Sequence, residues 1–575
     1  MAKLSRFLKI YTGAIILVFI LVFLQSLSQL YLPTLMAKIV DIGIVQGDTN
    51  YILRIGFFML IIAAGGVIST IAASFLSAKI GSGFGKNVRE QVFSRVESFT
   101  LHEFDKIGTA SLITRSTNDI TQVERVLMLI LRIMISAPMM GIGGIIMAVS
   151  KDLKLSLIIV IVIPIISIVI IYIAKKGMPL FKAIQIKLDK LNLVSREGLT
   201  GIRVIRALNR INHEQRRFDE ANTDLTNTAI KINQIMAAVM PIMMLIMNFA
   251  TIAIIWFGGI RIDDGSMQVG DMMAFIQYIM LIMFSLIMVS MMFVMVPRAS
   301  ASAVRINEVL DTIPEINDSQ QPKNPTTQRG FIEFKKVTFS YHGAEKPALS
   351  NISFSARPGE MTAIIGGTGS GKSTLISLIP RFYDISSGKI LIEGVNVHEI
   401  PQKSLRAKIG LVPQKSVLFT GTISENIRFG KDDASDNEVL HAAKTAQAIE
   451  FISKMPDGFA SVIAQGGNNL SGGQKQRLAI ARALVRKPDI YIFDDSFSAL
   501  DFKTDAKLRQ MLKEETKNST VLIVAQRIST IMDADQIIVL DQGEIVGIGK
   551  HKDLLNTCEV YREIVSSQLS EEELA

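Results

Sequence analysis

The residues from Gly366 to Thr374 read GGTGSGKST and match the phosphate-binding pattern G-x-x-x-x-G-K-[ST]. They follow the apolar run MTAII, so strand, loop and helix come in the order that this pattern requires. In such a loop glycines let backbone N–H groups face the phosphates, the lysine reaches the β and γ oxygens, and the hydroxyl after it ligates Mg²⁺. The predicted nucleotide-binding residues are Gly366, Gly367, Thr368, Gly369, Ser370, Gly371, Lys372, Ser373 and Thr374.

A second motif, LSGGQKQR at 470–477, precedes the stretch IYIFDDSFSALD (490–501) by about 20 residues. Taken alone, its Ser-Gly-Gly turn fits an ordinary helix N-cap. In this order and spacing behind a P-loop, however, it resembles the signature of the ATP-binding-cassette (ABC) family. The resemblance covers nearly the whole chain and implies ATP as the nucleotide and Mg²⁺ as its metal.

The resemblance also assigns roles to residues outside the P-loop. It implies that Tyr341 stacks on adenine and that Gln414, in IGLVPQ, contacts Mg²⁺ and faces the membrane domain. Asp494 closes the apolar strand IYIF, where the family holds its magnesium-binding aspartate, so Ser373, Gln414 and Asp494 form the predicted metal site. SALD (498–501), ending at Asp501, resembles the loop that crosses the dimer interface.

In this family two cassettes pair head to tail, and each ATP lies between the P-loop of one chain and the signature of the other. The signature residues are intact, so the chain is expected to complete its partner's site. These residues are Ser471, Gly472, Gly473 and Gln474.

The chain's own half of the site departs from the family at three positions. Asp495 replaces the usual glutamate and is shorter by one methylene, and a ~1 Å displacement of a catalytic group can cost on the order of a hundredfold in rate. Gln526 stands where the family has a histidine that contacts the γ-phosphate, and glutamine cannot become a cation at neutral pH. Gln465 stands where many exporters carry a glutamate.

Two interpretations of Asp495 and Gln526 remain open. The first is a tolerated conservative replacement in a slow but working enzyme. The second is a degenerate site that binds ATP with little turnover, paired with a different chain that supplies competent residues. The second pattern resembles the bacterial heterodimeric multidrug ABC exporters.

The elements around these motifs form two domains, because 575 residues exceed what one hydrophobic core holds. Six apolar stretches are long enough to cross a ~30 Å hydrocarbon core as helices. They lie near 13–37, 54–78, 127–149, 155–175, 232–258 and 272–297. The expected fold is an all-α six-helix transmembrane domain (1–311), a linker (312–330) and an α/β P-loop nucleotide-binding domain (331–575).

The charges beside these helices predict their orientation. Lys3, Arg6 and Lys9 precede the first helix, whereas the short loops after the first and fifth helices carry aspartates such as Asp41 and Asp264. The positive-inside rule then places the N-terminus and the nucleotide-binding domain in the cytoplasm of a multi-pass cell-membrane protein. Lys151, in the loop after the third helix, is an exception.

The segments after helices two and four continue as helices beyond the membrane. FDKIGTASLITRSTNDI (104–120) and REGLTGIRVIRAL (196–208) resemble the family's coupling loops. A net charge of +9 permits nucleic-acid binding, but no basic patch interleaved with aromatic residues is present, so nucleic acid is not expected as a partner. The expected partners are the lipid bilayer, a hydrophobic small molecule and a second, non-identical half-transporter.

Methionines are concentrated in helices five and six, among them Met240, Met243 and Met283. Such flexible side chains suit promiscuous apolar surfaces, although ordinary packing explains them equally simply. The sequence therefore predicts an ATP-hydrolysing subunit of a multidrug-type exporter of hydrophobic or amphipathic compounds. The alternatives are a homodimeric lipid or drug flippase with a slow ATPase, and a non-transporting ATP sensor that regulates a membrane partner.

Overall fold

The computed structural model describes residues 2–323 and 329–568, with the side chains at 2, 291, 293 and 294 left out. The chain divides into two compact units. The first ends at Thr312 and leaves out Ser98–Lys106, which belong to the second unit together with the residues from Ile313 onward. Residues 324–328 of the expected linker lie outside the described residues.

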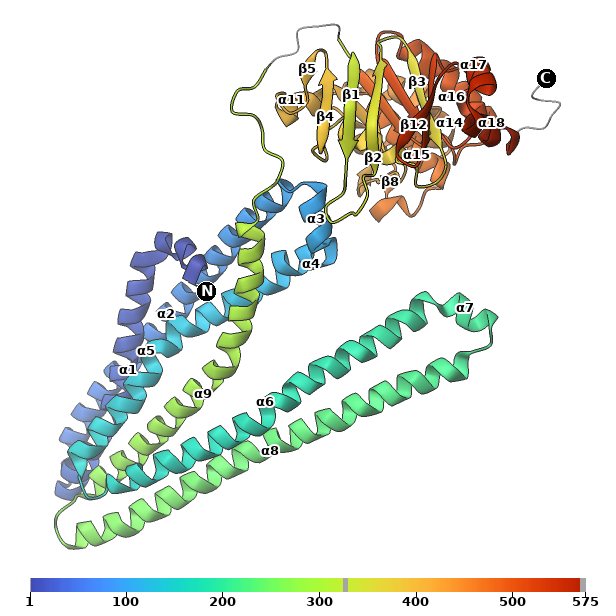
Figure 1. Ribbon diagram of the computed structural model, residues 1–575. Helices are drawn as coiled ribbons and strands as arrows, with labels where there is room; N and C mark the ends of the chain where they lie inside the picture. The colour runs from blue at the N-terminus through green and yellow to red at the C-terminus, as the bar shows by residue number, and fades with distance from the viewer. Residues whose placement is uncertain (1, 324–328, 569–575) are drawn as a thin grey trace. The chain divides into compact units, whose positions relative to one another are not determined.

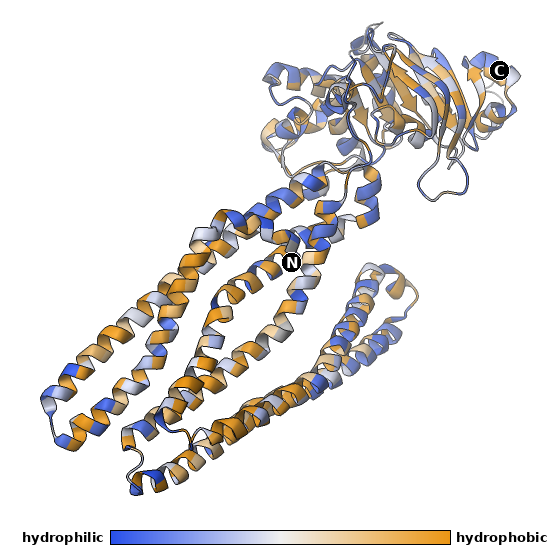
Figure 2. Ribbon diagram, turned by 60° about the vertical axis from the view of Figure 1, so that its left-hand side comes forward, coloured by the Kyte–Doolittle hydropathy of each residue, from blue (hydrophilic) through white to orange (hydrophobic). Residues whose placement is uncertain are grey.

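The first unit is entirely helical, and six of its helical segments are long and apolar enough to cross a membrane, as predicted. The main helices are α1 (Thr12–Lys38), α2 (Thr49–Glu97), α5 (Ile120–Lys151), α6 (Leu157–Thr200), α8 (Ile211–Asp263) and α9 (Val269–Asp311). Shorter segments are η1 (Ala2–Tyr11), the π-helical η2 (Ile39–Ile44), α4 (Thr109–Thr114), the π-helical η3 (Arg115–Asp119) and α7 (Ile202–Ala207). A lipid environment offers backbone groups no hydrogen bonds, and helices satisfy these groups internally. The long helices are mostly hydrophobic over their central turns and more polar toward the cytoplasmic ends (Figure 2).

Helices α6 and α8 form a long hairpin that packs chiefly on itself, whereas α1, α2, α5 and α9 pack together as a bundle (Figure 1). Near its loops the hairpin joins α9 through a buried cluster that includes Ile159, Ile254 and Tyr278. At the opposite end α7 has no buried residue, and Val204 and Leu208 are 61% and 67% exposed. Within the first unit, the tip of the hairpin therefore presents its apolar side chains without a cover.

Ion pairs tie together the loops at the end of the bundle remote from the cytoplasm. The guanidinium of Arg261 donates to Asp152 Oδ2 from Nε at 2.9 Å and from Nη2 at 2.7 Å, and the Asp152 side chain is 3% exposed. Lys151 Nζ lies 2.6 Å from Asp271 Oδ1. Pairing with Asp271 explains how a lysine is accommodated on the side of the membrane where the positive-inside rule does not expect it.

Each of the two π-helical segments presents an aspartate to α9. In η2, Asp41 Oδ1 accepts a hydrogen bond from the backbone N–H of Gly270 at 2.6 Å. In η3, the buried Asp119 accepts hydrogen bonds from Ser302 Oγ at 2.8 Å and from Arg305 Nε at 2.8 Å. The extra residue of a π turn redirects side chains, and here it directs one carboxylate toward each end of α9.

The second unit contains a mixed sheet and an antiparallel sheet. The mixed sheet has the order β12-β11-β3-β10-β9-β6, with β12 antiparallel at its edge and the other neighbours parallel. Its strands are β3 (Met361–Gly366), β6 (Ile409–Val412), β9 (Ile490–Asp494), β10 (Thr520–Val524), β11 (Gln536–Asp541) and β12 (Glu544–Gly549). The antiparallel sheet comprises β2 (Leu349–Ala356), β1 (Ile332–Phe339), β4 (Ser387–Ile392) and β5 (Val395–Asn396), and β7 (Gly421–Thr422) pairs with β8 (Val462–Ile463).

Helices cover the mixed sheet, because parallel strands are apolar on both faces and must be buried on both. The pattern of β10 is typical, since all five of its residues are buried. The α-helices are α10 (Lys372–Leu378), α11 (Gln402–Ala407), α12 (Ile423–Arg428), α13 (Asp436–Thr445), α14 (Ile449–Ile452), α15 (Gly472–Leu484), α16 (Phe502–Glu515), α17 (His551–Thr557) and α18 (Glu559–Ser566). Short 3₁₀ turns are η4 (Gly458–Ala460), η5 (Gln465–Gly467) and η6 (Ile528–Thr530).

Two further segments belong to the second unit. The short helix α3 (Leu101–Ile107) lies mostly within Ser98–Lys106, and Glu103 Oε1 accepts a hydrogen bond from Glu315 N at 2.9 Å. Beyond it, Ile316 is 6% exposed and Lys323 N donates to Glu399 O at 2.9 Å. The start of the expected linker is therefore packed against the nucleotide-binding domain.

Asp152→Asn should lower the stability of the full-length protein by about 2 kcal/mol, because it leaves the Arg261 guanidinium without its buried counter-charge. Lys3→Gln removes a different pair, Lys3–Asp311, whose side chains are 69% and 49% exposed, and should change stability by less than ~0.5 kcal/mol. The midpoints of thermal unfolding in detergent compare the two variants directly. Equal shifts of the two unfolding midpoints would show that the Asp152–Arg261 pair stabilises the protein no more than the exposed Lys3–Asp311 pair.

Candidate ATP site

The P-loop joins β3 to α10, and two of its glycines have left-handed backbones. Gly369 has φ +82° and Gly371 has φ +97°, a region that residues with a Cβ rarely adopt. A Cβ at Gly366 would come within 2.0 Å of Leu540 O. These positions therefore require glycine, and the resulting loop leaves its backbone N–H groups free of side-chain obstruction.

Lys372 brings its positive charge back over this loop. Its Nζ donates to Gly366 O at 2.9 Å and to Gly367 O at 2.6 Å. Burial lowers the pKa of Lys372, while Asp494 and Asp495 oppose that shift. The ammonium group thus lies where a phosphate chain held by the loop would meet it.

The oxygen atoms around Ser373 suit Mg²⁺. Ser373 Oγ donates to Asp494 Oδ1 at 3.2 Å, which brings a hydroxyl and a carboxylate together beside the P-loop. Mg²⁺ is typically held by one or two such protein oxygens together with substrate phosphates and water. In the described part of the chain no cluster of three or more His, Cys, Asp or Glu side chains offers an alternative metal cage. The residues present therefore fit the metal.

Tyr341 belongs to an aromatic group beside the same loop. Its ring packs edge-on against Phe339, with centroids 4.9 Å apart, and against Tyr383, with centroids 5.4 Å apart. Its hydroxyl lies 3.0 Å from Thr374 Oγ1. Tyr341 is 41% exposed, so it remains accessible to a planar base.

Asp495 is held by the side-chain amides of two glutamines. Its Oδ2 accepts a hydrogen bond from Gln526 Nε2 at 3.0 Å and a longer one from Gln414 Nε2 at 3.4 Å. Its own backbone is left-handed, with φ +46°, and its N–H donates to Val524 O at 2.9 Å. The structure therefore brings together two of the three positions at which the sequence departs from the family, Asp495 and Gln526.

Burial changes the ionisation of both carboxylates. It raises the pKa of Asp494, an effect that Ser373 opposes and the neighbouring Asp495 reinforces. It also raises the pKa of Asp495, against the hydrogen bond from Gln414. Two adjacent, desolvated carboxylates thus create the negative potential that a divalent cation relieves.

The signature residues begin helix α15 with a reciprocal cap. Gln474 N donates to Ser471 Oγ at 3.3 Å, and Ser471 N donates to Gln474 Oε1 at 2.8 Å. Ser471 and Gly472 are exposed, and a Cβ at Gly473 would lie 3.0 Å from Ala499 O in the SALD loop. Within residues 2–323 and 329–568, no hydrogen bond joins these signature residues to the P-loop.

Asp501, at the end of SALD, caps α16 by accepting a hydrogen bond from Thr504 N at 2.9 Å.

Two glutamines near the site were not identified from the sequence. Gln476, inside the LSGGQKQR motif, donates to Asp495 O at 3.2 Å, and Gln568 bonds the backbone of Gln526. Gln476 could have been found from the sequence because it lies inside a recognised motif. Gln568 could not, because it lies in no motif.

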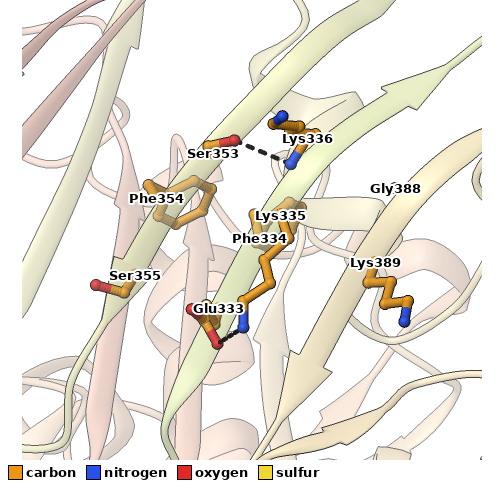
Figure 3. Close-up of a pocket in the computed structure, with 9 residues that line it drawn as sticks. All are labelled: Glu333, Phe334, Lys335, Lys336, Ser353, Phe354, Ser355, Gly388 and Lys389. Atoms are coloured by element: carbon orange, nitrogen blue, oxygen red, sulfur yellow. Dashed lines mark hydrogen bonds and ion pairs between the residues drawn. The ribbon is translucent and has the colours of Figure 1, made fainter.

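An open hollow on the antiparallel sheet, between β1, β2 and β4, is separate from these residues (Figure 3). Its charged side chains are three lysines and one glutamate, and Glu333 Oε2 lies 2.9 Å from Lys335 Nζ. The hollow contains none of the predicted ATP-binding residues. It is lined by Glu333, Phe334, Lys335, Lys336, Ser353, Phe354, Ser355, Gly388 and Lys389.

Six membrane helices joined to a P-loop domain with a separate signature helix define an ATP-driven membrane transporter. Two family models match the chain: the ABC transporter transmembrane region at residues 15–286 and the ABC transporter model at residues 349–498. The chain belongs to the ABC transporter family and is of the exporter type.

Relatives match over almost their full length. The chain is 41% identical to an uncharacterized ABC transporter ATP-binding protein of Mycobacterium tuberculosis, over 99% of this chain and 98% of that one. It is 31% identical to the ATP-dependent lipid A-core flippase of Chromobacterium violaceum, covering 99% and 97%. A solved bacterial Atm1-family ABC exporter with ATP bound superposes with a TM-score of 0.81 at 27% identity, covering 98% and 99%.

Family membership establishes the coarse activity. The chain is a multi-pass membrane protein with a cytoplasmic nucleotide-binding domain, and that domain implies ATP binding with Mg²⁺ and ATP hydrolysis coupled to transport. The predicted fold is confirmed: six apolar helices precede an α/β nucleotide-binding domain.

Asp494→Asn should reduce the gain in nucleotide affinity that Mg²⁺ provides by about tenfold, because it removes a charged oxygen ligand beside Ser373. Asp541→Asn is a matched control, since Asp541 ends β11, which β3 and β10 separate from β9 in the same sheet. Titration of the full-length protein with a non-hydrolysable ATP analogue, with Mg²⁺ and with EDTA, measures the effect. An unchanged magnesium dependence would exclude Asp494 as the metal-binding carboxylate.

Proposed function

We propose that this chain is one subunit of a heterodimeric ABC exporter whose own P-loop side binds ATP with little turnover. Its signature residues Ser471–Gln474 would complete the hydrolytic site of a different partner chain. The observation that carries this proposal is the hydrogen bond from Gln526 Nε2 to Asp495 Oδ2 at 3.0 Å.

That hydrogen bond joins the Asp495 carboxylate to the Gln526 amide. A group that positions or deprotonates an attacking water must keep an oxygen within about 3 Å of it. Asp495 is already one methylene shorter than glutamate, and its Oδ2 accepts hydrogen bonds from both Gln526 and Gln414. Both hydrogen bonds fall on Oδ2 and hold the short carboxylate against the two amides, which leaves it less free to reach a water.

Gln526 also favours slow hydrolysis, because its side chain is neutral. An amide donates a hydrogen bond but carries no positive charge, so it stabilises developing charge on a phosphoryl group less than an imidazolium would. By contrast, two of the three predicted Mg²⁺ ligands, Ser373 and Asp494, bond each other at 3.2 Å, and Lys372 lies over the P-loop. The chain's own site would therefore still bind ATP but would hydrolyse it slowly.

The exposed signature supports a two-chain site. Ser471 and Gly472 are exposed at the start of α15, and the capping box fixes their backbone. The hairpin α6–α8 presents an apolar tip that the described residues of the first unit do not cover. Both surfaces are explained by a second ABC half-transporter.

The transported compounds are proposed to be hydrophobic or amphipathic. The full-length likeness to proteins named lipid A-core flippases favours substrates with acyl chains or similar apolar parts. The methionines divide into two groups: Met243 and Met283 are buried in packing, whereas Met240 and Met244 are 72% and 66% exposed on α8. The exposed group offers a deformable surface to varied apolar molecules.

A second candidate is a homodimeric lipid or drug flippase with a slow ATPase. The flippase relatives, which match over almost the whole chain, favour it. In a homodimer both sites would contain Asp495 and Gln526, so the two candidates differ in what the chain does alone.

The full-length chain purified alone should therefore hydrolyse ATP at no more than about a hundredth of the rate reached with its partner. Adding a half-transporter with Glu and His at the corresponding positions should restore turnover and ATP-dependent uptake into inside-out vesicles. Robust turnover by the chain alone would reject the heterodimer and favour the flippase.

Replacing both residues tests the hydrogen bond itself. The double variant Asp495→Glu, Gln526→His should raise ATP turnover by the chain alone by at least tenfold, because it restores the reach of the carboxylate and the ionisable ring together. Asp495→Glu alone should raise it less, since the Gln526 amide would still hold the longer carboxylate. Steady-state phosphate release distinguishes the two. No gain from the double variant would show that these residues do not limit turnover.

A further inference from the structure

The backbone that carries Gln526 is held by a residue 42 positions later in the chain. Gln568 Nε2 donates to Gln526 O at 2.8 Å. On the other side of Arg527, Ile528 N donates to Gln568 Oε1 at 2.9 Å. One side-chain amide therefore satisfies a carbonyl and an N–H two residues apart, as a neighbouring strand would.

This contact lies where the sheet can no longer supply it. Strand β10 pairs with β3 and β9 only as far as Val524, and the segment from Gln526 to Ile528 follows beyond that end. A backbone segment that leaves a sheet needs other partners for its polar groups. Gln568 provides them although it is itself an exposed residue.

The turn that carries Gln568 is anchored in the core. It follows α18, whose Tyr561 and Val565 are both 0% exposed. The Tyr561 hydroxyl lies 2.7 Å from His551 Nδ1, which joins α18 to α17. The amide is therefore presented from a fixed helix end.

A continuous path leads from this turn to the ATP site. Gln568 holds the Gln526 backbone, the Gln526 side chain donates to Asp495 Oδ2 at 3.0 Å, and Asp494 beside it bonds Ser373 of the P-loop at 3.2 Å. Arg527, between the two bonded backbone groups, donates to Ser498 O at 3.0 Å.

We propose that Gln568 is a positioning residue for the phosphate end of the ATP site, acting by holding the segment Gln526–Ile528 in register so that Gln526 points into the site. Loss of Gln568 should therefore affect the binding of some nucleotides more than others. A residue that orients Gln526 affects a nucleotide with a γ-phosphate more than one without it, because the P-loop and Tyr341 hold the rest of the molecule. This inference uses the proposed location of Gln526 beside the terminal phosphate and does not depend on the identity of the partner.

The test measures affinity for two nucleotides on the full-length protein in lipid nanodiscs. Gln568→Ala should weaken Mg·AMP-PNP binding by about tenfold, within what two amide hydrogen bonds contribute. Mg·ADP binding should change by less than about twofold. Isothermal titration calorimetry gives both constants, and a merely structural role would weaken both nucleotides equally or neither.

Three further variants make the result specific. Ser567→Ala is the matched control, because Ser567 Oγ bonds only Ile564 O of its own helix and both affinities should stay unchanged. Gln568→Glu keeps the acceptor for Ile528 N but loses the donor to Gln526 O, so its effect should be intermediate. In the double variant Gln526→Ala, Gln568→Ala the loss should be no greater than in Gln526→Ala alone.

Additive losses in the double variant, or an equal loss for ADP and AMP-PNP, would overturn the proposal. Because binding is measured without turnover, the outcome is separate from that of the proposed function. Robust ATPase activity of the chain alone would reject the heterodimer and leave the role of Gln568 standing.

Discussion

The parallel pairing of β3, β10 and β9 is the constraint on which the nucleotide site depends. Val524 pairs with Ile364 on one side and with Asp494 on the other. Because parallel strands end at the same edge, the P-loop, the two aspartates and the segment carrying Gln526 all leave the sheet together. The buried apolar strands fix this register. The polar groups that follow the strand ends are therefore positioned by the packing of the core.

Two of the departures from the family, Asp495 and Gln526, are physically linked. With a histidine at 526 or a glutamate at 495, the same backbone would bring different groups into contact, so neither residue can be interpreted without the other. The short carboxylate and the neutral amide fit each other at 3.0 Å, and both are compatible with a site that retains ATP. The change is best described as a new local arrangement of hydrogen bonds.

The sequence predicted the six helices from their apolar length, the P-loop from its glycine-rich motif, and the α/β domain from the family that its motifs resemble. It did not predict the contacts made at a distance. Gln568 has no motif, and its role depends on how α18 packs on the core. The two π-helical segments and the pairing of Lys151 with Asp271 likewise depend on tertiary packing, which sequence spacing does not encode.

The uncovered tip of the α6–α8 hairpin has a consequence for the life of the protein in the cell. Val204, Leu208 and the neighbouring apolar side chains are exposed to water before assembly. Exposed apolar patches favour aggregation and recognition by proteases. In the proposed heterodimer, a chain made in excess of its partner would keep this tip exposed and be removed, so its steady-state amount should follow the supply of the partner.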